Sequence, residues 1–211
     1  MSSHNSATAL TCDPNNIHPI TGLVLAGGRA TRMGGEDKGL IRIAGEEMAA
    51  RVARALTPQV DQVLVNANRN QARYQALLGV PVIADSIGDF AGPLAGMLSA
   101  LEYIDQGWLL TCPCDSPLIA NDLAARLAQA AREAQVGLAI AHDGERLQPV
   151  FALMHCSLRD SMRSHLERGE RKIDRWYAQH PNATADFSDC TEMFLNINTP
   201  ADREALEKRM Q

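Results

Sequence analysis

The sequence predicts an α/β fold: a Rossmann-like, mostly parallel sheet with helices on both faces and a small antiparallel addition. Two observations support this prediction. Short apolar runs alternate with amphipathic stretches as far as residue 131, which is the pattern of strand–helix–strand crossover units. Further on, residues 137–154 form two apolar runs around Asp143-Gly144, which is typical of an antiparallel hairpin.

The predicted strands and helices alternate in order along the chain. Compact apolar runs typical of buried parallel strands occupy residues 20–26, 62–67, 80–85 and 108–112. The stretches between them place Ala, Leu, Met or Val on one face and are expected to be helices, at residues 46–56, 71–78 and 93–105. This order predicts that the first four strands run parallel.

Two later helices have recognisable starts. Asn121 is a candidate N-cap for a helix in which apolar residues recur at four-residue steps from 123 to 131. Near the C-terminus, Thr199 is expected to be an N-cap and Pro200 the first helical residue. Asp202 is then the acidic third residue of a capping-box-like start.

Length, composition and charge favour one domain without a broad polyanion-binding surface. A chain of 211 residues with 45% hydrophobic content can bury a sizeable core, so we expect residues 19–211 to form a single domain. Residues 1–18 are polar and are expected to be a loose tail. The net charge of −5 argues against a nucleic-acid partner. Because no run approaches the roughly 18 apolar residues of a span, no membrane partner is expected either.

The cysteines point to a reducing compartment. There are five of them, an odd number with irregular spacing, so a disulfide framework is not expected and the cytoplasm is the predicted location. Cys112 and Cys114 lack a second Cys or His pair at matching spacing, so we expect small buried residues there rather than ligands of a metal.

A glycine-rich loop follows the first predicted strand. The stretch "LVLAGGRATRMGGEDKG", residues 23–39, contains five glycines together with Arg29, Arg32 and Lys38. It fits neither G-x-x-x-x-G-K-S/T nor G-x-G-x-x-G. Its N–H groups can surround phosphate oxygens while the three cations supply charge. A plain surface turn would need only one or two glycines, so the loop predicts local anion binding.

Polar residues stand where other predicted strands end, and ligands of open α/β sheets bind at the carboxyl ends of the strands. Asp115 follows the strand at 108–112, and a single carboxylate there suits Mg²⁺ shared with waters and substrate phosphates. The alternative is an ordinary turn, since Asp before Ser-Pro is common in turns. Asp85 has the same two interpretations, base or ribose recognition against a simple turn. Asn66 and Asn68 end a third strand.

Five segments, in order, resemble one known family. "LVLAGGRATRMGGEDKGL", "GPLAGM", "PCDSP", "QPVFAL" and "NINTP" are similar to segments of the molybdenum cofactor guanylyltransferases, nucleotidyltransferases of the nucleotide-diphospho-sugar transferase fold. The resemblance runs from about residue 20 to the C-terminus. It implies transfer of GMP from GTP to the terminal phosphate of molybdenum-molybdopterin, with release of pyrophosphate. It also implies Mg²⁺ as cofactor, and it leaves molybdoenzyme maturation proteins open as partners.

The resemblance implies roles for individual residues. Those that match nucleotide-binding positions, together with the neighbouring Gly28, are Leu25, Ala26, Gly27, Gly28, Lys38, Asn66, Asp85 and Asp115. Asp115 would also be the magnesium ligand, and we assign catalytic roles to Arg32, Lys38 and Asp115. The segments associated with the pterin contain Gln148, Asn196 and Asn198.

Two other functions stay open from the residues alone. The first is a related transferase that uses CTP with molybdopterin or UTP with a sugar phosphate; "LAGG" rather than Leu-Ala-Ala-Gly argues against it. The second is a non-catalytic GTP-binding adaptor that delivers cofactor, against which the presence of both Lys38 and Asp115 argues. The transfer itself needs no general base, because a phosphate monoester with a second pKa of about 6 is already largely ionised near neutral pH.

Overall fold

A seven-stranded sheet forms the centre of the protein. The structure is a computed structural model, which describes residues 16–27, 37–88 and 92–209. The sheet has the order β5-β4-β1-β6-β8-β7-β9. Its strands are β1 (Ile20–Leu25), β4 (Gln62–Asn66), β5 (Val82–Ile83), β6 (Trp108–Pro113), β7 (Leu138–His142), β8 (Leu147–His155) and β9 (Ala183–Asp186). A separate small hairpin consists of β2 (Arg42–Ile43) and β3 (Glu46–Glu47).

Only β8 runs against its neighbours in this sheet. β1 pairs in parallel with β4 and with β6, and β4 with β5. β8 is antiparallel to both β6 and β7, whereas β9 is parallel to β7. The predicted mostly parallel sheet with an antiparallel addition is therefore confirmed, and the predicted hairpin around Asp143-Gly144 is the β7–β8 pair. The register aligns Leu25 with Asn66 and with Pro113, so β1, β4 and β6 end at the same level.

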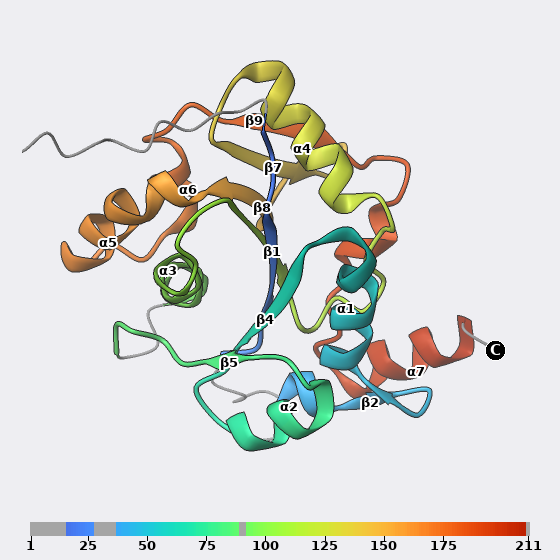
Figure 1. Cartoon of the computed structure of the whole chain (residues 1–211). Coiled ribbons are helices and arrows are strands. Elements are labelled where there is room, and N and C mark those ends of the chain that lie inside the picture. The colour runs from blue at the N-terminus through green and yellow to red at the C-terminus, as the bar shows by residue number, and fades with distance from the viewer. Residues whose placement is uncertain (1–15, 28–36, 89–91, 210–211) are drawn as a thin grey trace, which may run out of the picture.

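Helices cover both faces of the sheet (Figure 1). α3 (Pro93–Tyr103), α5 (Arg159–Glu167) and α6 (Ile173–Tyr177) lie on one side of the column of strands, and α1 (Met48–Leu56) and α4 (Leu123–Ala134) on the other. α2 (Gln71–Leu78) lies near β5, and α7 (Pro200–Arg209) lies near the small hairpin.

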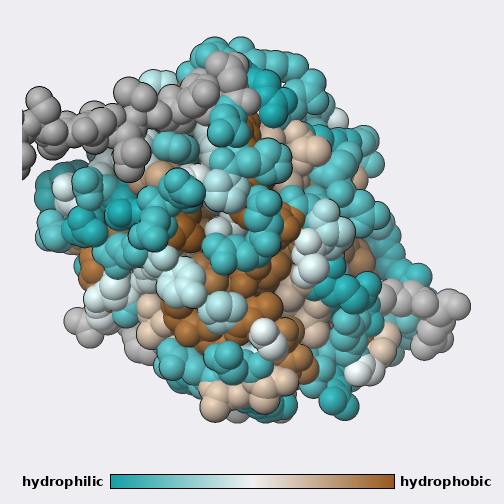
Figure 2. Space-filling view, viewed as in Figure 1, coloured by the Kyte–Doolittle hydropathy of each residue, from teal (hydrophilic) through white to brown (hydrophobic). Residues whose placement is uncertain are grey.

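Alternate side chains of most strands supply the two cores. On β1, Leu23 packs into the core under α3, and Val24 packs into the core under α1 and α4. Each fully buried side chain of this size contributes about 1.5–3 kcal/mol. Figure 2 shows apolar residues at the centre of the viewed face and hydrophilic residues around them.

Some local predictions were wrong. Residues 46 and 47 do not begin a helix; they pair with β2 across a turn in which Ala44 and Gly45 have φ values of 48° and 84°. The N-cap position of α4 is Asp122 rather than Asn121; the Asp122 side chain makes no capping bond, and the Ala124 N–H donates instead to Gln59 Oε1 at 3.1 Å. The strand expected at 80–85 is limited to Val82–Ile83. β9 was not predicted, because its four residues alternate too briefly to stand out in the sequence.

The start of α7 is as predicted. The Asp202 N–H donates to Thr199 Oγ1 at 3.2 Å, and the Thr199 N–H donates to Asp202 Oδ2 at 2.8 Å. These reciprocal bonds form the capping box. At the other end, residues 1–15 of the expected tail lie outside the described residues, and Ile17 is 2% exposed. Within the described ranges, no helix has the length and apolar character that crossing a membrane requires.

Candidate active site

Three segments that are distant in the sequence meet at Lys38. Its Nζ donates to Asp115 Oδ2 at 2.9 Å and makes a second, short hydrogen bond to Asn198 Oδ1. Lys38 begins a 3-10 turn at the end of the glycine-rich stretch 23–39, Asp115 follows β6, and Asn198 precedes α7. The Lys38 and Asp115 side chains are 25% and 17% exposed, so their charges are only partly screened by solvent.

The Asn196–Asn198 segment is hydrogen-bonded to the residues that follow β6. The Ile197 N–H donates to the Asp115 carbonyl at 2.9 Å, and Ser116 Oγ donates to Asn196 Oδ1 at 2.7 Å. The backbone N–H of Asn198 donates to the Asp202 carboxylate, and this bond is the main cause that lowers the pKa of Asp202. The start of α7 therefore holds Asn198 beside Lys38 and Asp115.

A second polar cluster lies at the end of β4. Asn66 Nδ2 donates to Asp85 Oδ1 at 2.9 Å, and Asn68 Nδ2 donates to Asp85 Oδ2 at 2.8 Å. Gly27 and Gly96 leave no room beside Asn66, since a Cβ at Gly27 would lie 2.9 Å from Asn66 Oδ1 and one at Gly96 would lie 2.7 Å from Asn66 Cγ. Glycine lets both backbones approach this closely, and the Asn66 amide is fixed as a result.

Gln148 lies at the start of β8 and bonds to the hairpin turn. Its Nε2 donates to Asp143 Oδ2 at 2.6 Å. Backbone N–H groups of Arg146 and Glu145 donate to the same carboxylate and, with Gln148, lower the pKa of Asp143 to about 2. The turn thus orients the Gln148 amide at the edge where β6 and β7 end.

The remaining predicted site residues divide into two groups. Leu25 is the last residue of β1, and Ala26 and Gly27 follow it; the Ala26 N–H donates to the Asn66 carbonyl at 2.8 Å. Gly28 and Arg32 lie outside the described residues. Sequence reasoning missed Ser116, which lies in the "PCDSP" segment directly after Asp115 but carried no separate signal.

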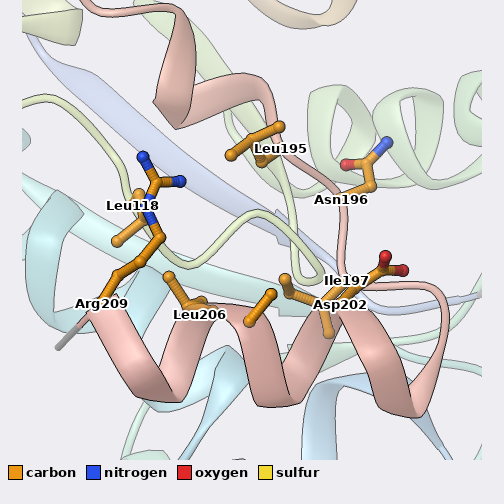
Figure 3. A pocket seen from close by; sticks show the side chains of 8 residues that line it. Leu118, Leu195, Asn196, Ile197, Asp202, Leu206 and Arg209 are labelled. Atoms are coloured by element: carbon orange, nitrogen blue, oxygen red, sulfur yellow. The ribbon is translucent and has the colours of Figure 1, made fainter. Parts of the chain in front are cut away.

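A small apolar pocket lies beside this arrangement (Figure 3). Its volume is about 190 Å³, with Asn196 and Asp202 at one end and Arg209 at the other. Leu195 and Leu206 face it from opposite sides. Sites for drug-sized ligands are usually about 300–1,000 Å³, so the pocket is too small for a nucleotide. The polar edge at Lys38 suits a triphosphate better.

Comparison with known proteins identifies the family. The family model described as the MobA-like NTP transferase domain matches residues 22–184. The chain belongs to this family. A protein of Shewanella sp. (strain MR-4) named molybdenum cofactor guanylyltransferase is 49% identical over 187 residues, which cover 89% of this chain and 94% of that protein. One of the same name from Ralstonia nicotianae is 47% identical over 199 residues, covering 90% and 97%.

Solved structures agree on the fold of the family. Molybdopterin-guanine dinucleotide biosynthesis protein A from Archaeoglobus fulgidus matches with a TM-score of 0.75 at 21% identity, covering 90% of this chain and 98% of that one. A 4-diphosphocytidyl-2C-methyl-D-erythritol synthase from Anaerococcus prevotii gives 0.71 at 12% identity, covering 91% and 96%. Because differently named proteins match almost equally well, the fold alone does not select a substrate.

Proposed function

We propose that this MobA-like protein transfers GMP from GTP to the terminal phosphate of molybdenum-molybdopterin, giving the guanine dinucleotide cofactor and pyrophosphate. The observation that carries the proposal is the Lys38–Asp115–Asn198 cluster at the carboxyl ends of the strands. It occurs in a chain 49% identical to a protein named molybdenum cofactor guanylyltransferase. This cluster offers a cation, a carboxylate and an amide, which suit a polyphosphate and the metal that accompanies it.

The donor set fits Mg²⁺. Asp115 and Asn198 each direct an oxygen at the Lys38 ammonium, and carboxylate and amide oxygens are hard ligands of the kind that Mg²⁺ prefers. The part of the chain that the structure describes contains no group of three His, Cys, Asp or Glu side chains suited to a metal. Waters and phosphate oxygens would complete the coordination, as is usual for Mg²⁺. When bound, the ion neutralises charge on the reacting phosphate.

Lys38 is the group that can exchange a protein partner for the nucleotide. Its ammonium is a compact charge on a flexible stem, and it is only partly buried. In the absence of nucleotide it neutralises Asp115, and with GTP present it stabilises phosphate oxygens at the same edge. Arg32 is proposed to help in this role. Catalysis is then chiefly electrostatic, as in other phosphoryl transfers.

No protein nucleophile is needed. The attacking group is a phosphate of the acceptor, which is largely ionised at neutral pH. The nearest thiol, Cys114, is buried, and burial raises its pKa well above the ordinary value, with Asp115 and Asp37 adding to the effect. The Cys114 side chain therefore stays a neutral thiol and does not compete as a nucleophile.

The two polar clusters suit the two substrates. Asp85, with Asn66 fixed beside it, is proposed to contact the nucleoside, next to the backbone of residues 25–27. Gln148, Asn196 and Asn198 are proposed to contact the acceptor.

The four cysteines that the structure describes are unpaired, which is consistent with the proposed cytoplasmic location.

Asp115→Ala tests the assignment. The variant is expected to lose all measurable formation of guanine dinucleotide from GTP, Mg²⁺ and molybdenum-molybdopterin, while it stays folded. Asp105→Ala is the matched control, since this exposed carboxylate stands before the same strand β6, at its other end, and should retain activity. Full turnover by Asp115→Ala with Mg²⁺ as the only metal would overturn the assignment.

A further inference from the structure

The carboxylate of Asp37, next to Lys38 in the sequence, accepts hydrogen bonds from α2 and from the residue that precedes this helix. Tyr74 Oη donates to Asp37 Oδ1 at 2.6 Å, and Asn70 Nδ2 donates to Asp37 Oδ2 at 3.2 Å. Asp37 is the first described residue after the gap at 28–36, and it directly precedes Lys38. Both oxygens of this carboxylate are thus bonded by neutral groups from one short segment.

Tyr74 also supports the backbone that follows. Its side chain is fully buried in the core under α1 and α4. A Cβ on Gly39 would lie 3.2 Å from two carbons of the Tyr74 ring and closer still to its hydroxyl, so glycine is needed there. Burial raises the pKa of Tyr74 far above its ordinary value, which keeps the hydroxyl a donor. Residues 37–39 therefore lie directly on this tyrosine.

Because Tyr74 and Asn70 bond to Asp37, the Lys38 ammonium pairs with a residue that is more distant in the sequence. Lys38 Nζ bonds to Asp115, and no ion pair joins it to its neighbour Asp37, although both residues are described. A carboxylate released from Tyr74 and Asn70 would compete for this ammonium.

We propose that Tyr74 and Asn70 are positioning residues that act through Asp37 to hold Lys38 beside Asp115 and the phosphates of GTP. The inference rests on the proposed function. It gives a role in nucleotide binding to a tyrosine whose surroundings otherwise resemble an ordinary core site. Neither residue touches the reacting atoms.

A double-mutant cycle tests this role. GTP binding in the presence of Mg²⁺ is measured by calorimetry for wild type, Tyr74→Phe, Asp37→Ala and the double variant. Tyr74→Phe removes only the hydroxyl. Because this hydroxyl donates to the charged Asp37 carboxylate, its loss is expected to raise the Kd for GTP by about tenfold. Since Tyr74 acts through Asp37, the double variant should bind GTP no worse than Asp37→Ala alone.

Tyr177→Phe is the matched control. Tyr177 is buried like Tyr74, and its hydroxyl donates to the Pro149 carbonyl at 2.7 Å, so this variant loses a comparable bond on the α3 side of the sheet. It should lose stability without a change in the Kd for GTP. Asn70→Gly tests the second donor with little risk of unfolding, because Asn70 is exposed and its φ of 52° suits glycine.

The outcomes separate clearly. An unchanged Kd in Tyr74→Phe with a lower melting temperature, or additive effects in the cycle, would overturn the inference and leave a purely structural tyrosine. If Tyr74→Phe does not fold, Asn70→Gly decides: a weaker Kd supports the inference and a wild-type Kd overturns it. Failure of the wild type to bind GTP or transfer GMP would instead refute the proposed function.

Discussion

Replacing Gly96 with alanine sets helix propensity against packing. Gly96 lies inside α3, where alanine would gain about 1 kcal/mol over glycine on propensity alone. Its Cβ, however, would lie 2.7 Å from Asn66 Cγ and 2.7 Å from Leu25 Cδ2. Leu25 can shift, but the Asn66 amide is bonded to Asp85 and cannot move without weakening that bond.

The magnitudes favour a net loss of stability. Overpacking typically costs about 1–3 kcal/mol, and loss of a hydrogen bond to a charged group costs about 1.5–3 kcal/mol. Against a propensity gain of about 1 kcal/mol, Gly96→Ala should lower the free energy of unfolding by about 1.5–5 kcal/mol. The disturbed Asn66 should also weaken GTP binding, because its cluster with Asp85 is proposed to contact the nucleoside.

Urea denaturation of Gly96→Ala and of a control measures this. The control is Gly88→Ala, since a Cβ at Gly88 meets no described atom within 4 Å and its φ is not positive. Gly88→Ala should be close to wild type in stability. A Gly96→Ala protein as stable as wild type, or more stable, would refute the reasoning, because helix propensity would then outweigh the contact with Asn66.

Three further predictions follow from the site and its supports. Thr199→Ala should lower the free energy of unfolding by about 1 kcal/mol through loss of the cap on α7, measured by urea denaturation; no change would contradict the capping box. Burial lowers the pKa values of His155 and His180 below the ordinary 6.5. Just below pH 6.5 both side chains are therefore neutral in the folded state, whereas in the unfolded state they bind protons. Stability should therefore be full above about pH 6.5 and fall as the pH drops below it, with a smaller fall in His180→Gln; an equal fall in that variant would contradict this origin. Lys38→Met should lose most GMP transfer in a steady-state assay yet remain folded, and unimpaired transfer would remove Lys38 from the mechanism.

Much of the fold followed from local patterns. The strands at β1, β4 and β6 were predicted within one or two residues, because buried parallel strands form continuous apolar runs between helices. The β2–β3 hairpin and β9 were missed, since strands of two to four residues leave no periodicity to detect. Their pairing depends on contacts with distant parts of the chain.

In the site, too, some residues could be predicted from the sequence and the contacts between distant segments could not. Asp115, Asp85 and Lys38 could be picked out because each stands after a predicted strand or in the glycine-rich loop. That Lys38 bonds to Asn198, 160 positions along the chain, could not be read from spacing. The contact of Tyr74 with Asp37 was hidden for another reason, since an aromatic residue in an amphipathic helix is normally a core residue. Pairings of this kind arise from the packing of segments that are distant in the sequence.

The central claim is that this edge of the sheet joins GMP to a pterin phosphate. The most direct measurement is incubation of the protein with GTP, Mg²⁺ and molybdenum-molybdopterin, followed by mass analysis of the products and a pyrophosphate assay. A guanine dinucleotide with one pyrophosphate released per molecule formed, and little product when CTP replaces GTP, is the predicted result. Binding of GTP without pyrophosphate release, or a preference for CTP, would contradict the account.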